Sequence, residues 1–125
     1  MLDSTVLIDA GRRREPALSW FQDALRRPDE IGVSAITIAE FFSGLRPPQR
    51  NEWQTLLEDV THWDVTRAIA IQAGIFCYDF ARRGRTIFTP DALIAATAVI
   101  GGAALVTANV RDFPMPEIEI IRLDV

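Results

Sequence analysis

Short apolar runs alternate with amphipathic stretches along the whole chain. Residues 16–27 place apolar side chains at helical spacing after Pro16, a residue suited to the first turn of a helix. Further helices are predicted over 37–45, 49–60, 66–84 and 89–102, and short strands over 31–36, 62–65, 103–107 and 118–123. Helices that alternate with strands predict an α/β fold with a mostly parallel sheet covered by helices.

Several helix ends carry residues with known end preferences. Thr66 and Thr89 are predicted N-caps, and Pro90 suits the first helical position. Thr37 and Glu40 have the T-x-x-E spacing of a capping box. Folds of this class place their active sites at the carboxyl ends of the strands. Functional side chains are therefore expected where strands end and helices begin.

Composition narrows the class of protein. A chain of 125 residues, 49% of them hydrophobic, predicts a single domain over 1–125 that buries a core without disulfides. Cys77 is the only cysteine, which excludes an internal disulfide and fits a reducing, cytoplasmic setting. No run approaches the roughly 18 to 20 apolar residues of a membrane span, so we expect no membrane association.

The net charge of the chain and its local arginine clusters bear differently on binding of nucleic acid. The formal net charge of −4 argues against capture of nucleic acid by an overall basic field. All thirteen basic residues are arginines, and they form local clusters at 12–14, at 26–27 and at 82, 83 and 85. Solvated helix ends, where cations complement the helix dipole, account for each cluster.

Four carboxylates, those of Asp3, Glu40, Asp91 and Asp112, occupy predicted strand ends or helix starts in apolar surroundings. Each has a local explanation. Asp3 suits a helix N-cap, Glu40 a capping box, Asp91 the positive end of a helix dipole, and Asp112 a turn. Taken separately, none of the four requires a function.

Together the carboxylates indicate a metal site. Apart from Asp91 and Thr97, the 89–102 helix is apolar on every side, which predicts a buried helix with Asp91 at the mouth of a crevice. Three or four converging carboxylates repel one another unless a divalent cation neutralises them. An all-oxygen set favours Mg²⁺ or Mn²⁺ over zinc, for which the chain offers only His62 and Cys77.

The scarcity of histidine and cysteine also limits the reactions that this chain could catalyse. One histidine does not supply a pair of general acid and base, and G-x-S-x-G and glycine-rich phosphate loops are absent. Metal-assisted hydrolysis is the chemistry that remains.

Four segments in order carry a family resemblance: LDSTVLID, SAITIAEFFSGL, TPDALIAATA and LVTANVRDF. They resemble the PIN-domain ribonucleases, and most closely the VapC-like toxins of bacterial toxin–antitoxin pairs. The resemblance implies an α/β/α sandwich whose mostly parallel sheet has about four to five strands. It also implies Mg²⁺- or Mn²⁺-dependent cleavage of RNA by an activated water, which leaves a 5′-phosphate.

The resemblance also assigns roles to individual residues. It implies metal-binding, catalytic carboxylates at Asp3, Glu40 and Asp91, and site-lining hydroxyls at Ser4 and Thr107. At the fourth acidic position many members carry aspartate where this chain has Asn109, and Asp112 follows three residues later. Either Asn109 or Asp112 is expected to complete the set of metal ligands. Asp112 is also a candidate catalytic residue.

Partners follow from the same resemblance. It implies a homodimer and a VapB-like antitoxin whose tail covers the acidic groove, where an arginine replaces the charge of the metal. Arg82, Arg83 and Arg85 are hypothesised to contact RNA phosphates.

Two alternatives remain at this point. Asn109 leaves open a catalytically weak or inactive PIN-like binding module, and a DNA-directed nuclease of related fold is a catalytic rival.

Only Met1 and Leu2 precede Asp3, which allows no more than a stub of a first strand or indicates a native start further upstream.

Overall fold

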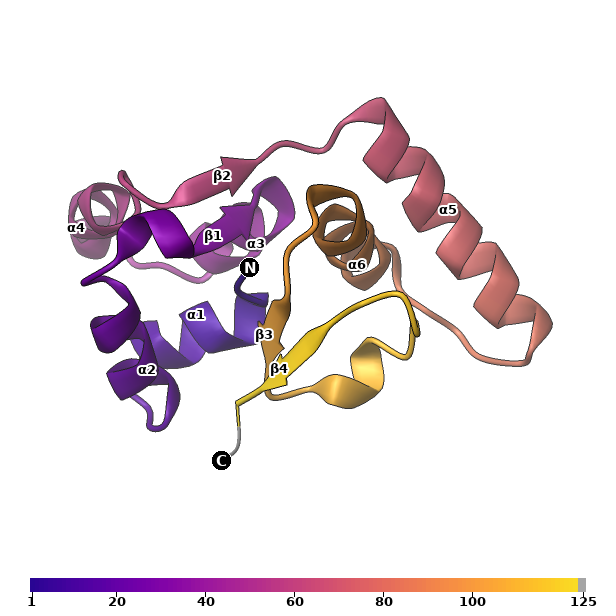
Figure 1. The fold of residues 1–125 in the computed structure, drawn as a ribbon. Helices are drawn as coiled ribbons and strands as arrows, with labels where there is room; N and C mark the ends of the chain where they lie inside the picture. The colour runs from indigo at the N-terminus through magenta and orange to yellow at the C-terminus, as the bar shows by residue number, and fades with distance from the viewer. Residues whose placement is uncertain (124–125) are drawn as a thin grey trace.

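The computed structural model describes residues 1–123. The helices are α1 (Ser4–Gly11), α2 (Ala17–Ala24), α3 (Ala35–Ser43), α4 (Arg50–Leu56), α5 (Arg67–Arg82) and α6 (Thr89–Gly101) (Figure 1). The strands are β1 (Gly32–Ser34), β2 (Thr61–Trp63), β3 (Leu105–Thr107) and β4 (Ile120–Arg122). Short 3-10 turns occupy η1 (Pro28–Glu30), η2 (Pro47–Gln49) and η3 (Val110–Asp112).

The strands form two parallel pairs that the N-terminal residues join. β1 pairs with β2 and β3 pairs with β4, both in parallel. The Leu2 amide donates to the Gly32 carbonyl at 2.9 Å, and the Val106 amide donates to the Met1 carbonyl at 2.8 Å. Residues 1–3 therefore act as the expected stub of a first strand, and the order across the sheet is β2, β1, residues 1–3, β3, β4.

Side chains of this sheet alternate between two cores. Met1 and Leu105 pack into one hydrophobic cluster with α5 and α6. Leu2 and Val106, their neighbours in sequence, pack into a second cluster with residues of α1, α2, α3 and α4. This alternation is that of a pleated sheet covered on both faces. The predicted α/β/α sandwich is confirmed, with short strands.

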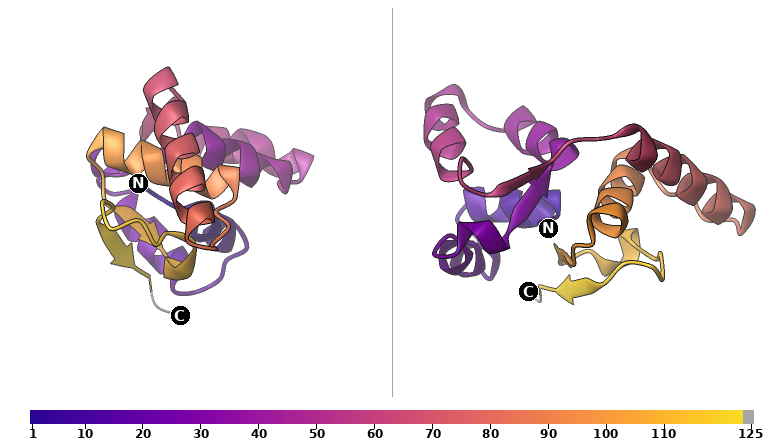
Figure 2. Two further views of the ribbon diagram at one scale, coloured as in Figure 1. Left: turned by 90° about the vertical axis from the view of Figure 1, so that its right-hand side faces the viewer. Right: turned by 45° about the horizontal axis from the view of Figure 1, so that its top comes forward.

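Helix α5 packs more extensively against α6 than against any other element. Figure 2 shows α5 on the outer side of α6, away from α1 to α4. Among the helices of residues 1–123, none combines the length and the apolar character needed to span a bilayer.

The predicted element boundaries hold in part. Thr66 is an N-cap as expected, and its hydroxyl accepts a hydrogen bond from the Ile69 amide at 3.2 Å. The prediction for Thr89 is wrong, because Phe88 occupies the N-cap position and α6 already begins at Thr89. The helix expected over 49–60 covers only Arg50–Leu56, since η2 precedes it and the chain turns toward β2 after Leu57.

Candidate active site

The central segment of the sheet ends at Asp3. The chain leaves this segment for β1 on one side, and β3 lies on the other, so the strand order reverses here. Crevices at such reversals, beyond the carboxyl ends of the strands, are the usual ligand sites of α/β sheets. Thr107 ends β3 and Ser34 ends β1 at the same edge. Sheet topology thus brings these three polar side chains together.

Asp3 is buried, with 4% of its surface exposed. Its Oδ1 accepts from the Ser4 amide at 2.7 Å, which makes Asp3 the N-cap of α1. Its Oδ2 accepts from the hydroxyls of Thr5 and Thr107, both at 2.8 Å. Burial raises the pKa of Asp3, the three hydrogen bonds oppose that rise, and the charge of Glu40 adds to it. The same side chain therefore caps α1 and accepts a hydrogen bond from Thr107 at the end of β3.

Glu40 is free of the capping role predicted from sequence. Ser34 is the N-cap of α3, because its hydroxyl accepts from the Thr37 amide at 3.0 Å, so the Thr37–Glu40 capping box is wrong. Glu40 lies in the second turn and is half-buried. Its Oε1 accepts from the Ser4 hydroxyl at 2.5 Å. Ser4 therefore links the start of α1 to the acidic side chain of α3.

Asp91 lies half-buried in the first turn of α6. Burial raises its pKa to about 6, and the negative charges of Asp112, Asp3 and Glu40 contribute in that order. The carboxylates of three separate segments therefore act electrostatically on Asp91. Among residues 1–123, none of these four carboxylates forms an ion pair with an arginine.

The two candidates for the fourth position lie differently. The backbone N–H of Asn109 donates to the Thr107 hydroxyl at 2.9 Å, and Asn109 is exposed. Asp112 ends η3, and its charge is the largest of those that raise the pKa of Asp91. Asp112 therefore places a negative charge near Asp91, whereas the side chain of Asn109 is neutral.

The donor set suits a hard divalent cation, because carboxylate oxygens whose charges are uncompensated dominate it. Within residues 1–123, no group of three or more Asp, Glu, His or Cys side chains is placed so that it could hold a metal ion by itself. Mg²⁺ commonly binds through one or two carboxylates and keeps several waters. The residues present fit that mode of binding.

Of the predicted phosphate contacts, only Arg85 lies beside the acidic cluster. Its guanidinium donates to the carbonyl of Arg111, and Arg85 and Asp112 line the same cavity. Arg82 instead donates to the Tyr78 hydroxyl at 2.7 Å at the end of α5. The Arg83 guanidinium lies 5.0 Å from the centroid of the Phe80 ring.

Several polar residues of the site were not predicted. Thr5 adds a donor to Asp3, and buried Thr37 donates to the Leu2 carbonyl at 3.4 Å. Thr5 directly follows Ser4, and Thr37 lies three residues before Glu40. These positions are the signals that could have identified them. Arg111 and Arg122 line the cavity at Asp112. Arg111 directly precedes Asp112 in sequence, whereas nothing local distinguishes Arg122.

Comparison with known proteins places this chain in a family. The model of the PIN domain matches residues 1–115. The chain belongs to the PIN-domain family. This PIN domain is 35% identical over 117 residues to Ribonuclease VapC10 of Mycobacterium tuberculosis, an alignment that covers 94% of this chain and 87% of the relative. It is 30% identical to Ribonuclease VapC19 of the same species, with 92% of both chains covered.

Solved structures share the fold over nearly the whole PIN domain. DNA-bound VapBC from Salmonella typhimurium matches with a TM-score of 0.77 and 27% identity, covering 98% of this chain and 96% of the other. A toxin–antitoxin complex from Klebsiella pneumoniae matches with a TM-score of 0.80 and 24% identity, covering 99% and 98%. These matches agree with the predicted resemblance to VapC-like proteins.

Proposed function

We propose that this PIN domain is the metal-dependent endoribonuclease toxin of a toxin–antitoxin pair, acting on cellular RNA in the cytoplasm. One observation carries the proposal: the charges of three carboxylates act on Asp91 at the strand reversal, and none of the four has an arginine partner among residues 1–123. The relatives named as VapC ribonucleases support RNA as the substrate.

Asp3, Glu40 and Asp91 would hold Mg²⁺ or Mn²⁺, some of them through water. Asp112 is favoured over Asn109 for the fourth place, because its charge acts on Asp91. A bound cation would supply Lewis acidity, which would make a nearby water easier to deprotonate and would offset negative charge on the phosphate. The proposed reaction is hydrolysis: water adds to phosphorus, the bond to the 3′-oxygen breaks, and a proton from the water ends on that oxygen, which leaves a 3′-hydroxyl and a 5′-phosphate.

The residues around the carboxylates fix their orientation before a ligand arrives. Three donors hold Asp3, two of them on Oδ2 and one on Oδ1. Since a carboxylate offers about four lone-pair sites, Oδ1 retains one for a further partner. The Ser4 hydroxyl orients Glu40 in the same way. Because these two carboxylates are already oriented, ligand binding spends less energy on ordering them.

A VapB-like antitoxin is the proposed protein partner, supported by matches to VapBC complexes. A cavity of about 370 Å³ adjoins Glu40 and is lined by apolar and cationic side chains, Ile8, Arg12, Phe41, Leu45 and Arg46 among them. An antitoxin tail seated there would reach the carboxylates. An arginine on that tail would replace the charge of the metal and block the acidic groove.

A homodimer is proposed from the two apolar faces of α5. Its core face is formed by Ile69, Ala73, Phe76 and Phe80. The opposite face carries Ile71, Ile75 and Tyr78, which are 55%, 47% and 60% exposed. A helix that is apolar on both sides is typical of an element buried on both sides.

Charge selects a second copy of this chain as the occupant of that exposed face. Arg67 and Asp79 lie toward opposite ends of the same face and are both exposed. If two α5 helices pack antiparallel with Ile71 opposite Ile75 of the second copy, Arg67 lies opposite Asp79 of the second copy at both ends. This isologous pairing buries the apolar centre and matches the charges.

Incubation of the purified protein with total cellular RNA tests the proposed activity, with Mg²⁺, with Mn²⁺ and with EDTA. Asp3→Asn and Asp91→Asn are the test variants, and Asp59→Asn at an exposed site is the matched control. We expect discrete cuts by wild type and the control in either metal, and none in EDTA or by the two test variants. Equal cleavage by Asp91→Asn would refute the proposal, and absence of cleavage under every condition would favour a binding module.

A further inference from the structure

A second cavity, of about 710 Å³, is built around the segment that follows β3 and shares no lining residue with the cavity at Glu40. We call it the arginine cavity. It is lined by Arg85, Ala108, Asn109, Val110, Arg111, Asp112, Pro114 and Arg122. Its three arginines come from the loop before α6, from η3 and from the end of β4.

The arginine cavity is connected to the candidate active site through its own wall. The backbone N–H of Asn109 donates to the Thr107 hydroxyl at 2.9 Å, and that hydroxyl donates to Asp3 Oδ2 at 2.8 Å. Asp112 belongs both to the cavity wall and to the set of charges that acts on Asp91. A ligand in the cavity would therefore lie next to the carboxylates.

Hydrogen bonding places one of the arginines. The Arg85 guanidinium donates to the Arg111 carbonyl, which ties the loop after α5 to η3. A guanidinium has five N–H donors, so this bond leaves Arg85 with others for a ligand. The bond uses the backbone of Arg111, and the Arg111 side chain is exposed.

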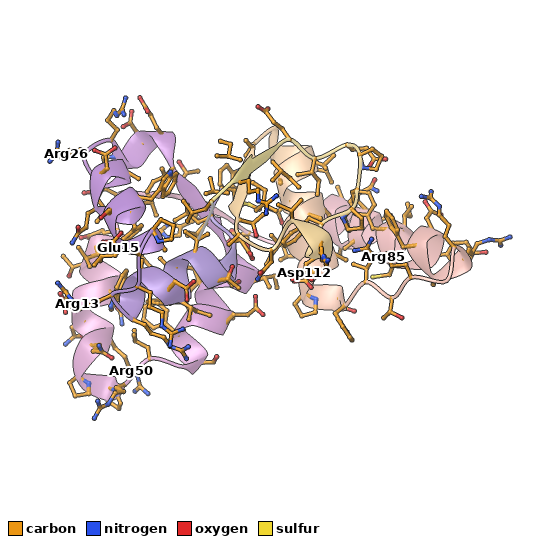
Figure 3. All side chains as sticks on the ribbon, turned by 90° about the horizontal axis from the view of Figure 1, so that it is seen from below. Arg13, Glu15, Arg26, Arg50, Arg85 and Asp112 are labelled. Atoms are coloured by element: carbon orange, nitrogen blue, oxygen red, sulfur yellow. The ribbon has the colours of Figure 1, made fainter. Side chains whose placement is uncertain are left out.

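The charge of the arginine cavity is opposite to that of the chain. The whole protein carries a formal charge of −4, whereas Arg85 and Arg111 outnumber the single carboxylate, that of Asp112, in the lining of this cavity. Figure 3 shows Arg85 and Asp112 on the same side of the molecule, with Arg13 and Arg26 on the other. Guanidinium groups bind phosphates through paired hydrogen bonds, so the cavity suits a phosphate better than a neutral ligand.

We propose that the arginine cavity binds a phosphate of the RNA strand beside the scissile phosphodiester, with Arg85 and Arg111 as its donors. This inference rests on the proposed ribonuclease function and adds a direction to it: the strand leaves the carboxylates across η3. It also explains how an acidic protein holds an acidic substrate, since a local group of arginines lies beside the carboxylates.

The double variant Arg85→Gln/Arg111→Gln tests the proposal, with Arg13→Gln/Arg26→Gln as a control of equal charge change. The readout is anisotropy of a fluorescent 12-nucleotide single-stranded RNA in EDTA over a series of NaCl concentrations. We expect the test variant to raise Kd about tenfold. The slope of log K against log salt should fall by about 0.7 for each phosphate that the variant no longer neutralises. The control should match wild type, and Arg85→Lys/Arg111→Lys should retain the slope.

Equal Kd and slope in wild type and the test variant would overturn the proposal, as would the absence of any binding. That equality is also what the cavity would show if it served an acidic segment of a protein partner. The result is independent of catalysis. Arginine-dependent binding without cleavage would refute the ribonuclease function alone, and cleavage with unchanged binding by the test variant would refute the phosphate site alone.

Discussion

Asp91→Asn should stabilise the metal-free protein while it abolishes cleavage. Asp91 is half-buried, and three other carboxylates raise its pKa further. Asparagine has nearly the same shape and no charge, so it removes the repulsion without opening a cavity. A residue that only supported the fold would show the reverse, with loss of stability on substitution.

The size of the effect follows from the pKa. A rise from 3.8 to about 6 is roughly two units, or about 3 kcal/mol at about 1.4 kcal/mol per unit. Solvent screening of a half-buried group reduces this to about 1–2 kcal/mol. Because the folded state binds the proton more tightly, wild type loses stability as the pH rises from 3.8 through about 6.

Urea denaturation followed by tryptophan fluorescence in EDTA measures this difference. Asp91→Asn should match wild type near pH 3.8 and exceed it above pH 6, and Asp59→Asn should follow wild type throughout. Mg²⁺ should then stabilise wild type more than the Asp91 variant. Lower stability of Asp91→Asn at neutral pH in EDTA, or a gain that is independent of pH, would refute the reasoning.

Three further outcomes follow from particular contacts. Thr107→Val removes a donor to Asp3, so it should lower the free energy of unfolding by about 1–3 kcal/mol in the same denaturation assay, and unchanged stability would contradict the hydrogen-bond assignment. Ile75→Asp should convert a dimer to a monomer in light scattering, because it charges the exposed face of α5, whereas a wild type that is already monomeric would exclude that interface. Gly32→Ala should lower the free energy of unfolding by about 1–3 kcal/mol, since the alanine Cβ would lie 2.8 Å from the Thr61 carbonyl oxygen. An unchanged melting temperature would show that β2 moves to accommodate the added carbon.

The layer structure could be predicted because α2 to α6 each show a helical period of apolar residues, whereas α1 was indicated only by the N-cap preference of Asp3. The apolar character of the 89–102 segment indicated a buried helix, and α6 is largely buried. Asp3 was predicted both as an N-cap and as a site residue, and the structure shows the cap as well as contacts with Thr5 and Thr107. Local rules suffice where a residue and its neighbours in sequence decide the outcome.

The remaining features depend on contacts across the fold. Thr37 and Ser34 both suit an N-cap of α3, and the pairing of Ser34 with Trp63 at the end of β1 keeps Ser34 outside the helix. Likewise, the effect of Asp112 on Asp91 arises only when η3 packs beside the start of α6. No spacing along the chain contains that information.

The chemical nature of the cut ends tests the central claim most directly. A 5′-labelled and a 3′-labelled RNA, cleaved at increasing Mg²⁺ and analysed by mass spectrometry, would report both the dependence on metal and the bond that breaks. Hydrolysis by water at the carboxylate cluster predicts cleavage that requires the metal and leaves 5′-phosphate and 3′-hydroxyl ends. Cleavage that persists in EDTA, or 2′,3′-cyclic phosphate ends, would contradict it.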